Sequence, residues 1–196
     1  MIEYIKGQVE TLTPTNVVLE NQGLAYFINI SLNTYSDIQA LKNCKLFIHE
    51  AIREDAYILY GFSSLLERST FQQLIGVSGV GANTARMILS SLSVQELESC
   101  ILSDNVGILK GVKGIGLKTA QRIILDLKDK MGKSGAHLHE NSALGVATSQ
   151  VRDEAVSALQ MLGFTQALSL KAVNNIVLEL PGLSVEQVIK AALKLL

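Results

Sequence analysis

The residues best suited to chemistry in this chain belong to a short string that occurs twice. Residues 74–85 recur 35 positions later as 109–120, with the apolar, glycine and Thr-Ala positions in register. Each copy holds a Gly-apolar-Gly turn ahead of a stretch that favours a helix. The glycines are Gly79 and Gly81 in the first copy and Gly114 and Gly116 in the second. Glycine permits backbone angles closed to other residues and keeps side chains away from a ligand.

Such a turn is suited to binding a phosphate group. Consecutive amide groups can converge on the anion, and the following helix adds unpaired N–H groups and the positive end of its dipole. A single Gly-x-Gly also serves as an ordinary corner between helices. Repetition in register, with Lys113, Lys118 and Arg122 around the second copy, favours phosphate binding. Contacts of this kind follow the nucleic-acid backbone and not its base sequence.

The two copies differ in charge. The first copy has uncharged Asn83 where the second has Lys118, so its first basic side chain is Arg86. We therefore include Arg86 with Arg122 among the candidate phosphate-binding side chains. The second turn is expected to supply more of the positive charge than the first.

Glu54 and Asp55 form an acidic pair between two stretches that favour β-strands. The pair is open to two interpretations from spacing alone, either solvated turn carboxylates or a functional pair. Paired acids can hold Mg²⁺, but no third clustered acid supports a metal site. His137 and His139 form a lone His-x-His that we assign to a solvated linker. No metal site is therefore predicted.

The composition limits the classes of protein that fit. The chain has 196 residues, enough for two or three small domains, and 48% are hydrophobic, enough for packed cores. No apolar stretch approaches the roughly 18 residues of a membrane span, and the N-terminus does not resemble a signal peptide. We expect a cytoplasmic protein in which Cys44 and Cys100 are buried free thiols.

Charge is distributed unevenly along the chain. The net charge is −1 overall, which argues against a generally basic nucleic-acid coat. Counted by segment, it is −3 for residues 1–62, +3 for 63–134 and −1 for 135–196. The doubled string thus lies in the only positive segment, so a contact with DNA is expected to be local.

The elements that must position these residues follow from periodicity. Residues 1–62 favour five short strands and hence a small barrel. The expected strands are 4–9, 16–19, 25–30, 45–52 and 56–60. Helices begin after Ser63, because Ser64 with Glu67 and Ser93 with Glu96 fit capping boxes. The helix after the second turn has one apolar stripe, formed by Ala120, Ile123, Ile124, Leu127 and Met131.

The C-terminal third has a different character. Residues 134–149 are small and polar without periodicity, which is typical of a linker. Residues 150–196 favour three short helices, with breaks near Gly163 and at Pro181-Gly182 and a capping box at Ser184–Gln187. The expected core of this segment is Leu159, Leu162, Leu168, Val173, Ile176, Val188, Ala192 and Leu195.

The doubled string resembles the helix-hairpin-helix motif of DNA repair and recombination proteins. Arg53-Glu54-Asp55-Ala56-Tyr57 and Leu59-Tyr60-Gly61-Phe62, just ahead of it, resemble the RuvA family. Members of this family are the DNA-binding subunit of the bacterial RuvAB complex, which migrates Holliday junctions. The resemblance implies an α+β multidomain fold. Its expected parts are an OB-type β-barrel at 1–62, a tandem helix-hairpin-helix domain at 63–133, a flexible linker at 134–149 and a three-helix, UBA-like domain at 150–196.

The resemblance also implies how the parts work. Four copies would form a homotetramer, with an octamer as the alternative on DNA, that holds an open four-way junction. Glu54 and Asp55 match the family's acidic pin, which helps to separate strands at the crossover. The phosphate-contacting positions of the family match Ser78, Gly79, Gly81 and Ala82 in the first turn, and Lys113, Gly114, Gly116, Lys118 and Thr119 in the second.

The partners implied by the resemblance are proteins as well as DNA. The C-terminal helices would recruit and stimulate RuvB, a hexameric ATPase, and the RuvC resolvase would join the larger complex. The processes implied are homologous recombination, DNA repair and the SOS response. The chain lacks a Gly-x-x-x-x-Gly-Lys-[Ser/Thr] loop, so we expect no ATP hydrolysis, no catalytic residue and no cofactor in this subunit.

One alternative belongs to a different class. A helix-hairpin-helix DNA glycosylase or nuclease would place a catalytic Asp downstream of a hairpin, and Asp126 or Asp129 fits that description. Both lie too close to the start of the helix to reach a flipped base, and the chain is short for an enclosing pocket. We therefore prefer the junction-binding interpretation.

Overall fold

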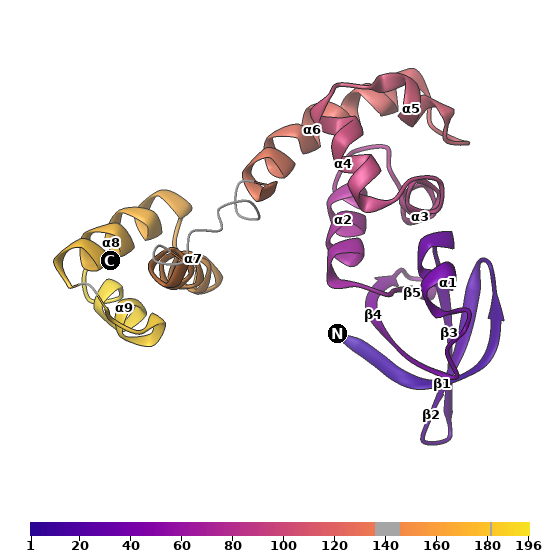
Figure 1. The fold of residues 1–196 in the computed structure, drawn as a ribbon, viewed down its shortest axis with the longest axis horizontal. Helices are drawn as coiled ribbons and strands as arrows, with labels where there is room; N and C mark the ends of the chain where they lie inside the picture. The colour runs from indigo at the N-terminus through magenta and orange to yellow at the C-terminus, as the bar shows by residue number, and fades with distance from the viewer. Residues whose placement is uncertain (136–145, 181) are drawn as a thin grey trace. The chain divides into compact units, whose positions relative to one another are not determined.

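A computed structural model describes residues 1–135, 146–180 and 182–196, with side chains described for 1–128, 151–178, 180 and 182–196. The chain divides into two compact units, Met1–His137 and Leu138–Leu196 (Figure 1). Each unit is built on its own hydrophobic clusters. No helix among the described residues is long and apolar enough to cross a membrane.

The first unit begins with a closed barrel in the order β1-β2-β3-β5-β4. Only β3 and β5 pair in parallel, and all other neighbours are antiparallel. The strands are β1 Tyr4–Thr13, β2 Asn16–Asn21, β3 Leu24–Ile30, β4 Asn43–Ile52 and β5 Tyr57–Phe62. The predicted five-stranded barrel of the OB type is confirmed, with longer strands than the sequence indicated.

Alternating apolar residues fill the barrel, with Val17, Leu19, Ile28 and Leu46 fully buried. A short helix that the sequence analysis missed, α1 Leu32–Ile38, lies between β3 and β4. Its N-cap is Ser31, whose side chain accepts a hydrogen bond from the Thr34 amide. A helix of two turns carries little periodicity, so the sequence pattern did not indicate it.

Five helices follow the barrel. They are α2 Leu65–Ile75, α3 Ala82–Ser91, α4 Val94–Leu102, α5 Val106–Gly111 and α6 Leu117–Gly135. The capping box predicted at Ser93–Glu96 is confirmed. At the start of α2 the prediction is only half right: the Ser64 hydroxyl accepts from the Glu67 amide, but the Glu67 carboxylate does not return to the N-cap.

Glu67 instead links the helices to the barrel. Its carboxylate accepts hydrogen bonds from the hydroxyls of Ser31 at 2.5 Å and Thr34 at 2.6 Å. The side chain is buried, and desolvation raises the pKa of the Glu67 carboxyl above its usual value despite these two hydrogen bonds. Because a buried carboxyl is costly without partners, this cluster fixes α2 against α1.

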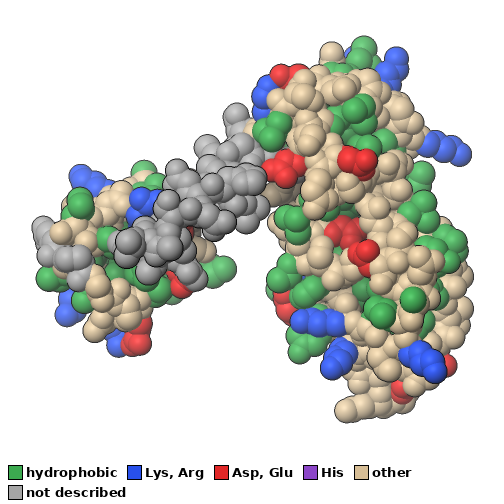
Figure 2. Space-filling model, viewed as in Figure 1, with side chains coloured by type: hydrophobic (Ala, Val, Ile, Leu, Met, Phe, Trp, Pro, Cys, Tyr) green, Lys and Arg blue, Asp and Glu red, His purple; other side chains and the backbone are tan. Residues whose placement is uncertain are grey.

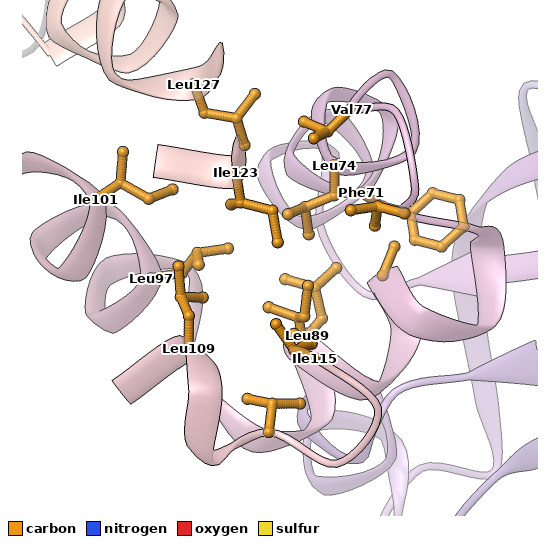
Figure 3. Packing of buried hydrophobic residues seen from close by; sticks show 14 of the residues in the cluster. Phe71, Leu74, Val77, Leu89, Leu97, Ile101, Leu109, Ile115, Ile123 and Leu127 are labelled. Atoms are coloured by element: carbon orange, nitrogen blue, oxygen red, sulfur yellow. The ribbon is translucent and has the colours of Figure 1, made fainter. Parts of the chain in front are cut away.

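One hydrophobic cluster joins the barrel to the helices. Leu74, Leu97 and Ile123, from three different helices, point toward one another in Figure 3. Tyr60 and Phe62 of β5 belong to the same cluster, and both rings lie about 5 Å from the ring of Phe71. The predicted stripe on α6 is buried at its four described side chains, which are Ala120, Ile123, Ile124 and Leu127.

The second unit contains α7 Val146–Met161, α8 Gln166–Glu179 and α9 Val185–Ala192. The three-helix prediction and the Ser184–Gln187 capping box are confirmed. Three residues assigned to the core are wrong, because Leu162, Leu168 and Leu195 are 60%, 52% and 67% exposed. Each lies on a helix face, or beyond a helix end, that the two neighbouring helices do not cover.

The predicted linker at 134–149 lies largely outside the described residues, as do His137 and His139. The four-part division of the chain therefore stays a prediction. The two cysteines are buried and unbonded, as expected: Cys44 in the barrel and Cys100 in α4. Burial raises the pKa of both thiols.

Candidate nucleic-acid interface

The two predicted turns connect α2 to α3 and α5 to α6, and their backbones are alike. Each is closed by three backbone hydrogen bonds whose donors and acceptors are offset by 35 residues between the copies. The bonds are Val77 N to Leu74 O, Val80 N to Val77 O and Ala85 N to Gly81 O at 3.0, 3.0 and 2.9 Å, and Val112 N to Leu109 O, Ile115 N to Val112 O and Ala120 N to Gly116 O at 3.1, 3.1 and 2.9 Å. The repeat in sequence is therefore a repeat in structure.

The first glycine of each turn has a backbone conformation that favours glycine. Gly79 has φ of 91° and Gly114 has φ of 90°. Gly81 differs, because its φ of −85° is open to any residue. The prediction of unusual backbone angles at both glycines of the first turn is confirmed for Gly79 and wrong for Gly81.

The second glycine of each turn needs another explanation. A Cβ added at Gly81 or Gly116 would meet no atom within 4 Å, so neither glycine is required by packing inside the protein. Gly81 is the N-cap of α3 and supplies no capping side chain. Ser, Thr, Asn or Asp would cap a helix better. Glycine here leaves the first N–H groups of α3 accessible from outside.

Small and polar side chains surround the turns on the solvent side. Val77 and Val80 are buried and anchor the first turn, whereas Ser78 between them is exposed. Lys113 takes the place of Ser78 in the second turn and is exposed too. Ala82 and Thr119, at the starts of α3 and α6, are half-buried. The predicted phosphate-contacting residues of each turn thus lie together on one exposed corner.

The second turn carries most of the positive charge. Lys113 and Lys118 are exposed and form no ion pair with any described side chain. Arg122 Nε lies 3.8 Å from Asp126 Oδ2, but both side chains are well exposed, so this pair is weak. Figure 2 shows Lys and Arg side chains projecting at the end of the unit where α5 lies in Figure 1.

Arg86 has a different environment from the other candidates. Its Nη1 donates to the backbone carbonyl of Thr15 at 3.0 Å and to Asn29 Oδ1 at 3.2 Å, both in the barrel region. The side chain is half-buried. Arg86 therefore points toward the barrel, whereas Lys118 on the second hairpin has no such contact among the described residues.

The acidic pair lies at the tip of the β4–β5 hairpin. Ile52 and Tyr57 are the last paired residues of the two strands, and the Arg53 amide donates to the Ala56 carbonyl at 2.8 Å across the turn. Glu54 and Asp55 are both exposed in this turn. The described residues contain no group of three or more possible metal ligands. Two carboxylates thus project into solvent from one short hairpin.

Family models match three parts of the chain. Residues 1–61 match the RuvA N-terminal domain, residues 71–129 match a SAM-like helix-hairpin-helix tandem, and residues 150–196 match the RuvA C-terminal domain. Together these segments include both turns, nearly all of the barrel and most of the three C-terminal helices.

Curated relatives match over nearly the full length. A protein of Bacteroides thetaiotaomicron is 56% identical over 199 residues, with 99% of each chain covered. Relatives from Bacteroides fragilis and Parabacteroides distasonis are 55% and 53% identical, with at least 99% of each chain covered. The chain belongs to the RuvA family. All three relatives are named Holliday junction branch migration complex subunit RuvA.

This RuvA-family chain contains one contact network beside the acidic tip that sequence reasoning missed. Glu50 on β4 accepts hydrogen bonds from the Tyr57 hydroxyl at 2.5 Å and from the Ile2 amide at 2.7 Å. These hydrogen bonds lower the pKa of the Glu50 carboxyl, and the Tyr57 hydroxyl has a larger effect than the Ile2 amide. The pair of Glu50 and Tyr57 spans the two strands of the hairpin, so only the strand register could have indicated it.

Proposed function

We propose that this chain is the junction-binding subunit of a branch migration complex. It binds the backbone of a four-way DNA junction, holds the junction open, and recruits and stimulates the RuvB ATPase in homologous recombination and DNA repair. The observation that carries the proposal is the pair of matching turns in which glycine leaves helix N–H groups accessible at an exposed corner.

Phosphate binding by the two turns follows from their geometry. Helix N–H groups and the helix dipole attract an anion, and each contact stabilises it by about 0.3 to 1 kcal/mol. Gly79, Gly81, Gly114 and Gly116 leave room for a DNA strand to approach the main chain. In the second turn Lys113, Lys118 and Arg122 add charge, whereas the first turn relies on Ser78, Ala82 and backbone amides. No base edge is contacted this way, so binding is independent of base sequence.

The acidic tip is proposed to act at the crossover. Carboxylates repel phosphate, so Glu54 and Asp55 are unsuited to binding DNA and suited to keeping strands apart. Their hairpin is short and its strands are paired up to Ile52 and Tyr57, which holds the charges in place. In a homotetramer the four tips would gather at the centre of an open junction, and a second tetramer would complete an octamer.

The C-terminal unit is proposed to bind RuvB. Several of its apolar side chains are exposed, including Met161 at 87% and Leu178 at 81%. A domain of 47 residues with such a surface is suited to docking on a partner. Attachment through a linker would keep it at high effective concentration near a ring-shaped ATPase. The complex would act in the cytoplasm, with RuvC as a further partner and the SOS response as its setting.

An assay with purified components tests this function. The chain alone, incubated with a synthetic four-way junction and with damaged duplex, should retain the junction without strand scission or base release. Addition of RuvB and ATP should then drive branch migration. Scission or base release by the chain alone would support the glycosylase or nuclease alternative, and an absence of migration with active RuvB would contradict the proposal.

A further inference from the structure

We propose that Arg86 is a positioning residue that fixes the first hairpin to the barrel and thereby contributes to selectivity for a four-way junction. The alternative role for the Arg86 side chain is direct contact with a DNA phosphate. The inference rests on the proposed function, because it concerns how the phosphate-binding turns are oriented relative to the acidic tip.

The guanidinium of Arg86 is engaged by the barrel. One nitrogen, Nη1, donates both to the Thr15 carbonyl at 3.0 Å and to Asn29 Oδ1 at 3.2 Å. Hydrogen bonds from a charged donor are roughly twice as strong as neutral ones. Thr15 lies between β1 and β2, and Asn29 lies on β3, so a single side chain connects α3 to two places on the barrel.

Hydrogen bonds from Leu32 and Asn33 also hold α3 in place. Asn33 Nδ2 donates to the carbonyls of Leu89 at 2.7 Å and Leu92 at 2.9 Å, at the C-terminal end of α3. The Leu32 amide donates to Ser90 Oγ at 3.1 Å. Figure 1 shows α1, which contains Leu32 and Asn33, beside α3. Arg86 attaches α3 to the barrel nearer the loop that holds Gly79 and Gly81.

The first turn of α3 also touches the barrel. The Tyr60 hydroxyl on β5 lies 3.3 Å from Asn83 Oδ1. Tyr60 is in the strand that continues from the acidic tip, since β5 begins at Tyr57 directly after the turn that holds Glu54 and Asp55. The first phosphate-binding turn and the acidic tip are therefore attached to one barrel, and the distance between them is fixed by contacts of α3.

The repeat shows that Arg86 is not the counterpart of a phosphate-binding residue. With Ala85 aligned to Ala120, the position equivalent to Arg86 is Gln121, and Arg122 aligns with Met87. Gln121 is exposed and has no hydrogen bond to the barrel among the described residues. The charged side chains of the second hairpin thus form no hydrogen bond to the barrel among the described residues, whereas Arg86 of the first hairpin forms two.

Four variants of the full chain separate the two roles: Arg86→Met, Asn29→Ala, the double variant, and Lys118→Met as a matched removal of one charge from the second hairpin. For each, the affinities for a four-way junction and for a linear duplex of the same sequence are measured over a range of salt concentrations. Melting temperatures are recorded so that all binding is measured on folded protein.

A positioning role predicts a specific pattern. Arg86→Met should lower junction affinity at least about tenfold, which is the lower end for a charge-assisted hydrogen bond, because it removes both hydrogen bonds of the guanidinium. Duplex affinity and the salt dependence of binding should stay unchanged. Asn29→Ala should act in the same direction, because it removes one of the two Arg86 hydrogen bonds together with the Asn29 Nδ2 bond to the Leu59 carbonyl. The double variant should lose less affinity than the sum of the two single losses, because both changes remove the Arg86–Asn29 hydrogen bond. Lys118→Met should weaken binding to both DNAs and reduce the log–log salt slope by about 0.9 for each phosphate that is no longer neutralised.

A phosphate-binding role predicts the opposite pattern, which would overturn the inference. Arg86→Met would then behave like Lys118→Met, and Asn29→Ala would leave binding unchanged or tighter by releasing the guanidinium. If Arg86→Met does not fold, Asn29→Ala alone decides between these outcomes. A different result would contradict the proposed function itself: junction affinity that is unchanged in Lys118→Met and in variants of the turn glycines.

Discussion

Gly81→Ser should make the protein slightly more stable and its binding to a four-way junction weaker. Gly81 is the N-cap of α3, with φ of −85° and ψ of 169°, angles that serine adopts without strain. A Cβ at this position would meet no protein atom within 4 Å. The new Ser hydroxyl could accept a hydrogen bond from the Thr84 amide, three residues on, as other N-cap serines in this chain do. Serine is a better N-cap than glycine by roughly a few tenths of a kcal/mol.

The same change should cost binding energy for two reasons. The added side chain occupies the space through which a phosphate would approach, and the hydroxyl takes an N–H group that the phosphate would use. Removing one N–H contact of this kind costs about 0.3 to 1 kcal/mol. In the proposed tetramer, with one Gly81 turn in each subunit, the total is about 1 to 4 kcal/mol, or between about tenfold and a thousandfold in affinity.

Fluorescence anisotropy with a labelled junction measures the affinity, and thermal unfolding measures the stability. Gly23→Asn is a suitable control, because Gly23 has φ of 87° in the turn between β2 and β3 and open space around it. Asparagine tolerates that conformation, so junction affinity should stay unchanged. If Gly81→Ser bound the junction as tightly as the original chain, the reasoning about accessible N–H groups would be refuted.

Three further predictions concern other parts of the molecule. Replacing Glu54 and Asp55 with Gln and Asn should tighten binding to linear duplex and reduce unpairing at the crossover, measured by 2-aminopurine fluorescence; unchanged fluorescence would argue against the acidic pin. Truncation after Lys133 should preserve junction binding and abolish RuvB-driven migration, and migration by the truncated chain would disprove that division. Burial raises the pKa of Glu67 above 4.5, so the folded protein binds this proton more tightly than the unfolded chain. Its contribution to stability is then present below the unfolded pKa and is lost as pH rises through the folded pKa. Ionisation of Glu67 should therefore lower the melting temperature as pH rises above 4.5, and Glu67→Gln should remove this part of the pH dependence. If the variant and the original chain showed the same change of melting temperature with pH, Glu67 would not be its cause.

The barrel was predictable where local periodicity is strong. Alternating apolar residues identified all five strands, because the barrel buries one face of each. Helix α1 was not predicted, because it is stabilised by tertiary contacts. Thr34 and Ile38 are buried, and the Thr34 hydroxyl donates a hydrogen bond to Glu67, 33 residues away. The same contact explains why Glu67 does not complete the capping box at Ser64.

The positions of the two turns were predictable, because they are encoded in short strings of sequence. The register of the repeat located both turns, and the unusual backbone angle expected at Gly79 is confirmed. The environment of Arg86 was not predictable, since its partners Thr15 and Asn29 are 71 and 57 residues away. The exposure of Leu162 was not predictable from its residue type either. The packing of three helices decides which face of each helix is covered.

Competition between DNA shapes measures whether binding follows the shape of the junction and not its base sequence. The chain should be titrated with a four-way junction, with a second junction of unrelated sequence, and with linear duplex made from the same strands. We expect equal affinity for the two junctions and at least about tenfold weaker binding to duplex, a difference of about 1.4 kcal/mol. Equal affinity for junction and duplex, or a preference for one junction sequence, would contradict the account.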